Sequence, residues 1–145
     1  MNKYIPDIYN LIQELSWRFG SRGLDGECCG DLSLVEYMAL KIAWESEELS
    51  IQEIGSALNF TKSGASRIID RLENKGYAVR KRSPVDGRVC CVVLTAKGTE
   101  TVTKIMKRNT AYVEEMLKDL KPEVVKNVKS ALEILVNSVR RQGFI

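Results

Sequence analysis

The stretch SIQEIGSALNFTKSGASRIIDRLENKGY, residues 50–77, contains two short helical segments joined by a turn. Ser50 and Glu53 form a capping box at the start of the first segment, and Thr61 can cap the second. Apolar residues at helical spacing give each segment one face to bury, and Gly76 is suited to ending the second. Two short capped helices around a turn of about three residues predict a helix-turn-helix.

A β-hairpin is predicted directly after this motif. Two strand-like runs, residues 77–82 and 89–95, are separated by SPVDGR, residues 83–88. Pro and Asp-Gly favour the turn that such a connection needs. The order of elements is therefore that of a winged helix-turn-helix, with the hairpin as the wing.

Helical periodicity continues on both sides of the motif. Upstream, apolar residues recur over residues 5–19, and a second capping box at residues 33–36 opens a helix that is apolar nearly all round and is expected to be central. Downstream, long amphipathic helices begin at Ala96 and Pro122. Together these helices carry more apolar surface than a winged core can cover, which predicts a two-fold homodimer. A monomeric helical cap is the alternative.

The charge of the chain is concentrated in the predicted motif. The net charge is only +3, yet residues 62–88 contain eight basic and three acidic side chains and carry +5, which leaves −2 for the rest. A compact basic segment favours a polyanionic partner, although a solvated charged helix face is the alternative. The chain has no histidine, which excludes Ser-His and Cys-His catalysis and histidine metal sites.

In this order the elements resemble the MarR family of winged-helix regulators over nearly the whole chain. Three pieces carry the resemblance: RIIDRLENKGY (67–77), the Asp-x-Arg of the wing tip in Asp86 and Arg88, and LTAKG (94–98), which closes the wing into a long helix. The resemblance implies a homodimer that binds palindromic operators in double-stranded DNA. It also implies release of the DNA on meeting a small molecule, a metal or an oxidant.

The second helix of the motif carries the side chains that reading DNA requires. Ser63, Ser66 and Arg67 lie off its apolar stripe and are candidates for base contacts in the major groove. Lys62, Arg71 and Lys75 are expected at phosphates, although each position alone could be plain surface. The full set of predicted DNA contacts is Thr61, Lys62, Ser63, Ser66, Arg67, Arg71, Lys75, Arg80, Lys81, Arg82, Asp86 and Arg88.

The wing is predicted to contact DNA as well. Arg88 is placed to enter a minor groove, where a narrow width concentrates negative potential. Asp86 can hold that guanidinium through a charge-assisted hydrogen bond. Arg80, Lys81 and Arg82 in the first strand are expected to neutralise phosphates.

The predicted fold class is mainly α with a small β-hairpin wing. We expect an N-terminal dimerisation helix and loop (1–32), a winged helix-turn-helix DNA-binding domain (33–98) and C-terminal dimerisation helices (99–145). No apolar run approaches the roughly 20 residues needed to span a bilayer. The first residues have acidic side chains and no apolar core, unlike a signal peptide, which predicts a cytoplasmic protein without membrane partners.

Four cysteines form two adjacent pairs, Cys28-Cys29 before the second helix and Cys90-Cys91 in the second wing strand. Vicinal thiolates suit soft ions such as Cu(I), Zn(II) or As(III), or oxidation. Neighbours in a strand point to opposite faces, so Cys90 and Cys91 cannot readily share one metal. We expect no required cofactor. A soft metal or an oxidant sensed through cysteines is one hypothesis for the effector, and incidental thiols are its alternative.

An organic ligand is the other candidate effector. The resemblance implies a pocket between the winged lobe and the dimerisation helices. Aromatic and methionine side chains that could line it are also typical of a plain core, which is the alternative interpretation. These residues are Trp17, Tyr37, Met38, Trp44 and Met106.

Two other classes of function fit parts of the sequence. A thiol-redox enzyme would use a vicinal cysteine pair, but the chain has no Cys-x-x-Cys motif and no βαβ setting. A winged-helix protein-interaction module without DNA binding is opposed by the basic helix and basic wing tip in one chain. We therefore predict a non-enzymatic transcriptional regulator, and specifically a repressor.

Overall fold

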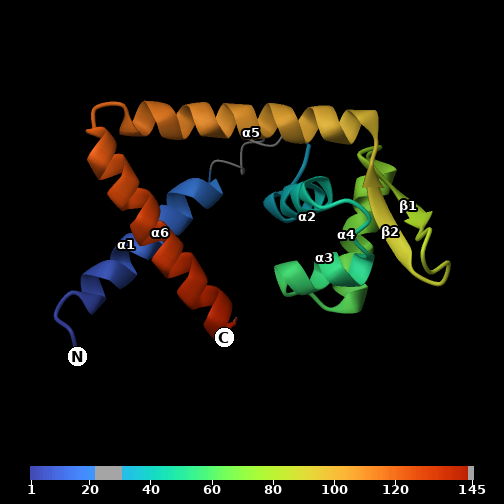
Figure 1. The fold of residues 1–145 in the computed structure, drawn as a ribbon, viewed down its shortest axis with the longest axis horizontal. Helices are drawn as coiled ribbons and strands as arrows, with labels where there is room; N and C mark the ends of the chain where they lie inside the picture. Colours follow the sequence, from blue (N-terminus) through green and yellow to red (C-terminus); the bar gives the residue numbers. More distant parts are fainter. Residues whose placement is uncertain (22–30, 144–145) are drawn as a thin grey trace. The chain divides into compact units, whose positions relative to one another are not determined.

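The structure, a computed structural model, describes residues 1–21 and 31–143 and confirms the predicted fold class (Figure 1). The described residues form two compact units, residues 1–106 and 107–145. None of their helices is long and apolar enough to cross a bilayer. The elements in chain order are α1 (Ile5–Ser21), α2 (Leu34–Glu45), α3 (Ile51–Leu58), α4 (Lys62–Asn74), β1 (Ala78–Arg82), β2 (Cys90–Leu94), α5 (Ala96–Leu117) and α6 (Pro122–Gln142).

Both predicted capping boxes are present and fix where α2 and α3 begin. Ser33 Oγ accepts the Glu36 N–H at 3.1 Å, and Glu36 Oε1 accepts the Ser33 N–H at 2.8 Å. Ser50 and Glu53 repeat the exchange at α3, with distances of 3.0 and 3.2 Å. Each box satisfies two N–H groups that a helix start leaves without partners.

The turn between α3 and α4 is tight and locally encoded. Asn59 ends α3 in the left-handed conformation with φ 59°, and Thr61 Oγ1 caps α4 by accepting the Gly64 N–H at 3.0 Å. The two helices approach closely, since a Cβ added at Gly55 would lie 2.8 Å from the Cβ of Ala65. These features confirm the helix-turn-helix.

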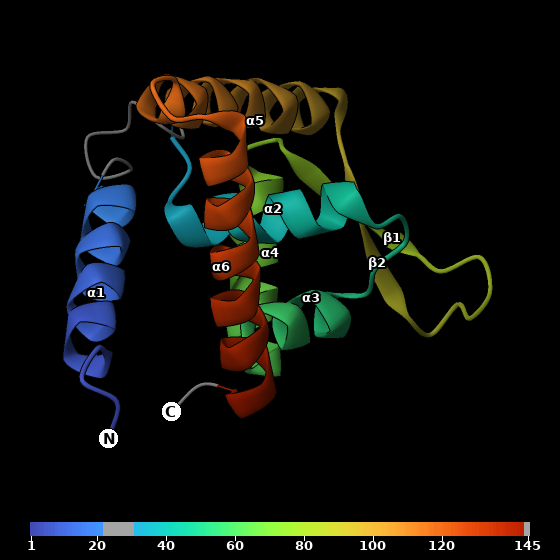
Figure 2. The same cartoon turned by 60° about the vertical axis from the view of Figure 1, so that its left-hand side comes forward.

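The core of the first unit surrounds α2, as the apolar pattern of that helix predicts. α2 packs against α3, α4 and β2, and α4 packs against β1 (Figure 2). The largest side chains that are fully buried come from α2, α3, α4, β2 and α5. They are Leu40, Ile54, Ile69, Leu72, Val92 and Val102.

The wing is a two-stranded antiparallel hairpin whose loop projects away from α2 and α3 (Figure 2). Its register pairs Ala78 with Leu94 and Lys81 with Cys91. The second strand is also tied to the segment before α3, because the Val92 N–H donates to the Leu49 carbonyl at 2.9 Å. The hairpin is therefore attached along part of its length to the helical body.

The LTAKG segment joins β2 to α5 through Thr95 and Gly98. Thr95 Oγ1 accepts the Gly98 N–H at 3.0 Å and donates to the Gly76 carbonyl at 2.7 Å, while the Thr95 N–H donates to the Tyr77 carbonyl at 3.0 Å. Gly98 lies against the same Tyr77 carbonyl so closely that an added Cβ would overlap its oxygen. Only glycine fits this crossing without a shift of backbone.

The terminal helices α1 and α6 expose apolar side chains throughout. No described residue of α6 is buried. Its apolar residue Ile134 is 66% exposed, and Val139 is exposed as well. α1 likewise exposes Leu11, Ile12 and Leu15. Amphipathic helices bury such faces in folded proteins, so the single chain leaves both faces uncovered.

Candidate nucleic-acid interface

The outward face of α4 carries the predicted reading residues. Its apolar stripe of Ala65, Ile68, Ile69 and Leu72 is buried, as the periodicity predicts. This anchoring leaves Ser63 and Arg67 exposed and Ser66 half-buried at the opposite side of the helix. Thr61 and Lys62, at the start of the helix, and Arg71, near its end, are exposed as well.

Arg80 lies between β1 and α4 and is already paired. Its guanidinium forms ion pairs with Asp70, at 2.7 Å, and with Glu73, and it donates to the hydroxyl and carbonyl of Ser66 at 3.2 Å. Burial lowers the pKa of Arg80, but the hydrogen bonds to the two carboxylates outweigh it and the pKa is raised. This geometry favours a role in fixing the wing to α4 over phosphate neutralisation.

Lys75 is also engaged within the fold. Its Nζ donates to Glu36 Oε1 at 3.0 Å and to the Asp31 carbonyl at 2.5 Å. Glu36 is 3% exposed, and its other oxygen has no hydrogen-bond partner among the described residues. Burial raises the pKa of Glu36, but the bonds from the Ser33 N–H and Lys75 outweigh it and hold the pKa below 4.5.

Tyr77 and Lys97 extend this cluster to the wing and α5. The Tyr77 hydroxyl donates to the Asp31 carboxylate, and this hydrogen bond lowers the pKa of Asp31. Burial and the same bond raise the pKa of Tyr77 to about 12. Lys97 Nζ lies 4.5 Å from the centre of the Tyr77 ring and donates to the Lys75 carbonyl at 2.8 Å. Together with Glu36 these residues join four segments at the carboxyl end of α4.

This cluster was not predicted from the sequence. Glu36 was expected as half of a capping box and Lys75 as a phosphate ligand, but their pairing was not expected. The two residues are 39 positions apart, and Tyr77 and Asp31 are 46 apart. One weak sign of the cluster is present in the sequence. Glu36 lies in the first turn of an otherwise apolar helix, and its capping role uses only one of its two carboxylate oxygens.

The wing tip has the geometry that the sequence predicts. Asp86 Oδ1 accepts the backbone N–H of Arg88 at 3.0 Å and its Nε at 3.2 Å, while Oδ2 lies 3.5 Å from Nη2. These bonds lower the pKa of Asp86, the backbone bond most strongly. The Arg88 side chain is nevertheless 92% exposed, so its orientation is set without burying its charge.

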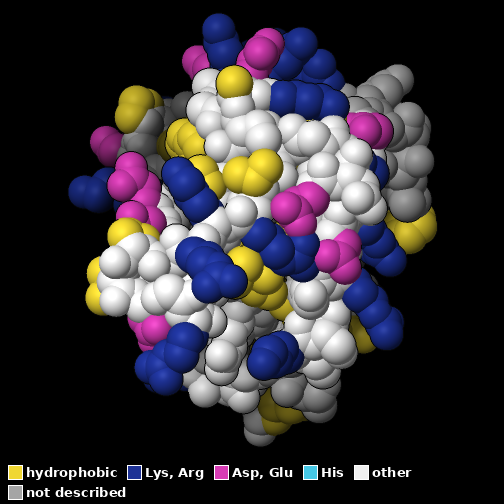
Figure 3. All heavy atoms as spheres, turned by 90° about the vertical axis from the view of Figure 1, so that its right-hand side faces the viewer, with side chains coloured by type: hydrophobic (Ala, Val, Ile, Leu, Met, Phe, Trp, Pro, Cys, Tyr) yellow, Lys and Arg dark blue, Asp and Glu magenta, His cyan; other side chains and the backbone are white. Residues whose placement is uncertain are grey.

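The remaining basic residues leave an uncompensated positive surface. Lys and Arg side chains are spread over the side of the molecule on which the hairpin lies (Figure 3). Lys75, Arg80 and Arg88 form ion pairs with carboxylates. Within the described part of the chain no such ion pair is formed by Lys62, Arg67, Arg71, Lys81 or Arg82.

The cysteines that the structure describes lie on opposite faces of β2. Cys91 is buried and its thiol donates to the Glu48 carbonyl at 3.2 Å, whereas Cys90 is half-buried. Cys28 and Cys29 lie outside the described residues. Within residues 1–21 and 31–143 no cluster of three acidic, cysteine or histidine side chains could hold a metal ion.

The five residues predicted to line an organic-ligand pocket are distributed over several environments. Tyr37 belongs to the core, and Met38 and Met106 pack against it. Trp17 lies on the exposed surface of α1. Trp44 alone of the five lines the pocket described below, which the sequence did not predict.

A family model described as the MarR family matches residues 32–90. Among relatives, the chain is 28% identical over 101 residues to the uncharacterised HTH-type regulator YdgJ of Bacillus subtilis, covering 70% of this chain and 62% of YdgJ. It is 29% identical over 94 residues to the HTH-type regulator MhqR of the same organism, covering 65% of each. The matched segment therefore spans less than two thirds of both relatives.

Solved structures match over nearly the whole chain. AbsC, a MarR family regulator from Streptomyces coelicolor, is 25% identical with a TM-score of 0.76, and 97% of each chain is covered. Streptococcus pneumoniae FabT, solved in complex with DNA, is 22% identical with a TM-score of 0.75, covering 98% of this chain and 96% of FabT, which shows a shared fold. The match to the family model, the winged architecture and these likenesses all support a MarR family transcriptional regulator with a winged helix-turn-helix.

Proposed function

We propose that this protein is a homodimeric, sequence-specific transcriptional regulator that represses genes in the cytoplasm by binding palindromic double-stranded DNA. The observation that carries the proposal is the combination of an unpaired basic face on α4 with a preoriented arginine at the wing tip. The protein acts by binding and not by catalysis. The DNA complex of FabT, a protein of the same fold, supports this choice.

In this proposal α4 enters the major groove and the wing follows the adjacent minor groove. Ser63 and Arg67 reach base edges, with Arg67 suited to a guanine. Lys62 and the free N–H groups at the start of α4 bind a phosphate, which the helix dipole also favours. Arg88 inserts into the minor groove while Asp86 holds it.

The DNA proposal predicts separable effects for base and phosphate contacts. Arg67→Ala and Arg88→Ala are each expected to cost about 1–3 kcal/mol of operator affinity and to relax sequence preference. Lys62→Ala is expected to weaken binding to all sequences and to reduce the slope of log K against log[salt] by about 0.9, as loss of one phosphate contact requires. Fluorescence-anisotropy titrations at several salt concentrations, on duplexes from upstream of its own gene, measure both.

Lys126→Ala is the matched control, because it removes one exposed positive charge from α6, which is part of neither the helix-turn-helix nor the wing. A control that weakens binding as much as Arg67→Ala would show a general charge effect and contradict the proposed interface. Binding that does not respond to salt would contradict it as well. An intact fold with no DNA affinity would favour the protein-interaction module.

The dimer is proposed from the uncovered apolar faces of α1 and α6. Sedimentation equilibrium is expected to give twice the chain mass of 16.3 kDa. Leu11→Glu and Ile134→Glu are expected to shift the equilibrium toward monomer, because each places a charge on an apolar face. Val85→Glu, on the exposed wing loop, is the control. A monomer at all concentrations would contradict the proposal, as would a DNA footprint without two half-sites about 10 bp apart.

The effector is proposed in two forms. A soft metal or an oxidant would act through Cys28 and Cys29, with Cys90 and Cys91 as the less suitable pair because they lie on opposite strand faces. Titrating the protein and its Cys28→Ser/Cys29→Ser variant with oxidant, Cu(I), Zn(II) or As(III) separates a thiol sensor from incidental thiols. The second candidate effector is an organic ligand.

A further inference from the structure

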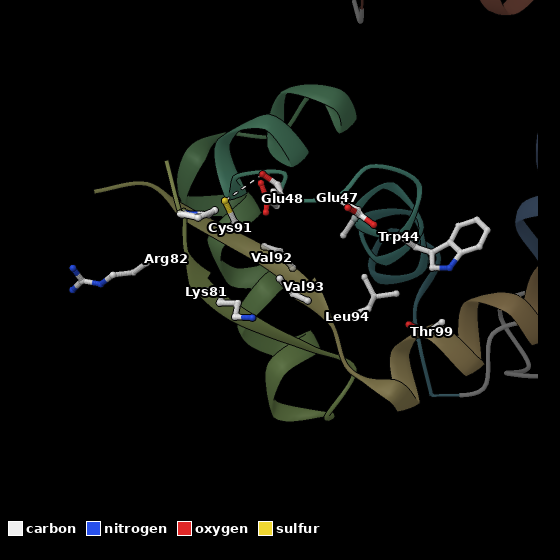
Figure 4. Close-up of a pocket in the computed structure, with 12 residues that line it drawn as sticks. Trp44, Glu47, Glu48, Lys81, Arg82, Cys91, Val92, Val93, Leu94 and Thr99 are labelled. Carbon is white, nitrogen blue, oxygen red and sulfur yellow. Dashed lines mark hydrogen bonds between the residues drawn. The ribbon is translucent and has the colours of Figure 1, made fainter. Parts of the chain in front are cut away.

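A pocket of about 550 Å³ lies between β2, the end of α2 and the start of α5, entirely within the first unit (Figure 4). This volume falls in the range of small-molecule sites. The pocket is distinct from the predicted site, with which it shares only Trp44. It also lies away from the exposed reading face of α4, none of whose residues lines it.

The floor of the pocket is apolar. Four successive residues of β2, namely Cys91, Val92, Val93 and Leu94, line it, together with Ala43 of α2. Trp44, in the last turn of α2, forms a side wall, and its ring is partly accessible. An aromatic wall beside an aliphatic floor suits a flat ring, which can contact both.

Charged side chains of opposite sign border this floor from different elements. Glu47 and Glu48 come from the turn after α2, and Lys81 comes from β1 directly opposite Cys91 (Figure 4). None of the three forms an ion pair within residues 1–21 and 31–143. Arg82 also lines the pocket but extends away from it in Figure 4.

The acidic border is held in place by backbone geometry. Glu48 has φ 60°, which is uncommon for a residue with a side chain, and its carbonyl accepts the Cys91 thiol at 3.2 Å. The bridge between Ser50 and Cys91 fixes the same turn to β2. The acids and the floor therefore belong to one supported structure, as a binding site requires.

We propose that this pocket binds a small aromatic zwitterion, of the class of amino-substituted aromatic acids. Its ring lies between Trp44 and Val93, its ammonium group faces Glu47 and Glu48, and its carboxylate faces Lys81. A ligand with both charges can pair with the carboxylates of Glu47 and Glu48 and with the ammonium group of Lys81. A purely anionic ligand would meet two carboxylates, and a purely cationic one would meet the lysine.

Binding at this site would connect the wing to the helical body. Lys81 belongs to the hairpin and Glu47 to the α2–α3 turn, so one ligand bridges two segments that are otherwise joined through the edge of β2. Its consequence for DNA affinity rests on the proposed function, because the same hairpin carries Arg88. The binding site itself does not depend on it.

The test uses Trp44 as its own reporter in the full chain carrying Trp17→Phe. This variant is titrated with 4-(aminomethyl)benzoate and, separately, with benzoate and benzylamine, which each keep one of its two charges. We expect saturable quenching by the zwitterion, with about tenfold or greater weakening for each singly charged analogue. Lys81→Met and Glu47→Gln should each abolish the preference for the zwitterion, whereas Lys62→Met, an exposed lysine outside the pocket, should not.

The outcomes are distinguishable. No saturable binding by any of the three probes overturns the site. Preferential binding of benzoate or of benzylamine overturns the zwitterion assignment, as does an unchanged preference in both pocket variants. DNA titrations with and without the ligand form a separate arm. If the ligand binds but DNA affinity is unchanged, the coupling is overturned, and if DNA is not bound at all, the proposed function fails while the site stands.

Discussion

Replacement of Gly98 by alanine is expected to lower the free energy of unfolding by about 3 kcal/mol and the melting temperature by roughly 10 °C. The added Cβ would overlap the carbonyl oxygen of Tyr77, which cannot move freely because it accepts the Thr95 N–H. Relief requires a shift of the first turn of α5 or of the start of the hairpin. Thermal unfolding followed by circular dichroism measures the loss.

Gly20→Ala is the matched control for this substitution. Gly20 also lies in a helix, but an added Cβ meets nothing within 4 Å. The change is expected to leave stability unaltered or to raise it by up to about 1 kcal/mol, because alanine favours helix more than glycine does. If Gly98→Ala melted at the same temperature as the unchanged protein, the tight crossing between hairpin and α5 would be wrong.

The second large effect is expected from Lys75→Met, which leaves the buried carboxylate of Glu36 without its cation. Removing one member of a buried pair costs about 3–5 kcal/mol, and we expect about 2 kcal/mol here because the Lys75 side chain is 31% exposed. The pair connects the end of α4 to α2, so we expect DNA affinity to fall too. The slope of log K against log[salt] should stay unchanged, because Lys75 is engaged by Glu36 and not by a phosphate.

Glu36→Gln separates the pair from the capping role of the same side chain. Glutamine still accepts the Ser33 N–H in a capping box, so only the charge is removed. The double variant Glu36→Gln/Lys75→Met should be more stable than Lys75→Met alone, because no buried charge is left unpaired. A stable Lys75→Met protein with a salt slope reduced by about 0.9 would instead make Lys75 a phosphate ligand.

Acid unfolding provides a further measure of the same carboxylate. The pKa of Glu36 is lowered in the folded protein, so its contribution is present above the ordinary value of 4.5 and is lost as the pH falls through the lower folded value. Stability should therefore decline below about pH 4.5 in the unchanged protein. Glu36→Gln should show a smaller decline over that interval.

The sequence predicted the elements whose signals are local. The capping boxes at Ser33 and Ser50, the cap at Thr61 and the left-handed Gly76 are each specified by a few neighbouring residues, and all are present. The bond between Asp86 and Arg88 joins residues two apart and was equally accessible to prediction. Such signals do not depend on how distant segments pack.

The sequence could not predict contacts that form only once distant segments meet. Lys75 and Arg80 are basic side chains of the kind that bind phosphates. No residue near Lys75 in the sequence indicates that it pairs with the Glu36 carboxylate. The pairing of Arg80 with Asp70 and Glu73 requires the angle between β1 and α4. The pocket beside Trp44 likewise forms only when α2, the wing and α5 come together, and the sequence of α2 alone does not indicate it.

The pairing of Arg80 has a consequence for how the protein measures a duplex. Its guanidinium joins β1 to two carboxylates of α4, so the helix and the wing are held at a fixed spacing. In the proposed complex they would move together, and the distance from a major groove to the neighbouring minor groove would become part of what is recognised. A duplex whose helical pitch departs from that setting would be rejected even where every base is correct.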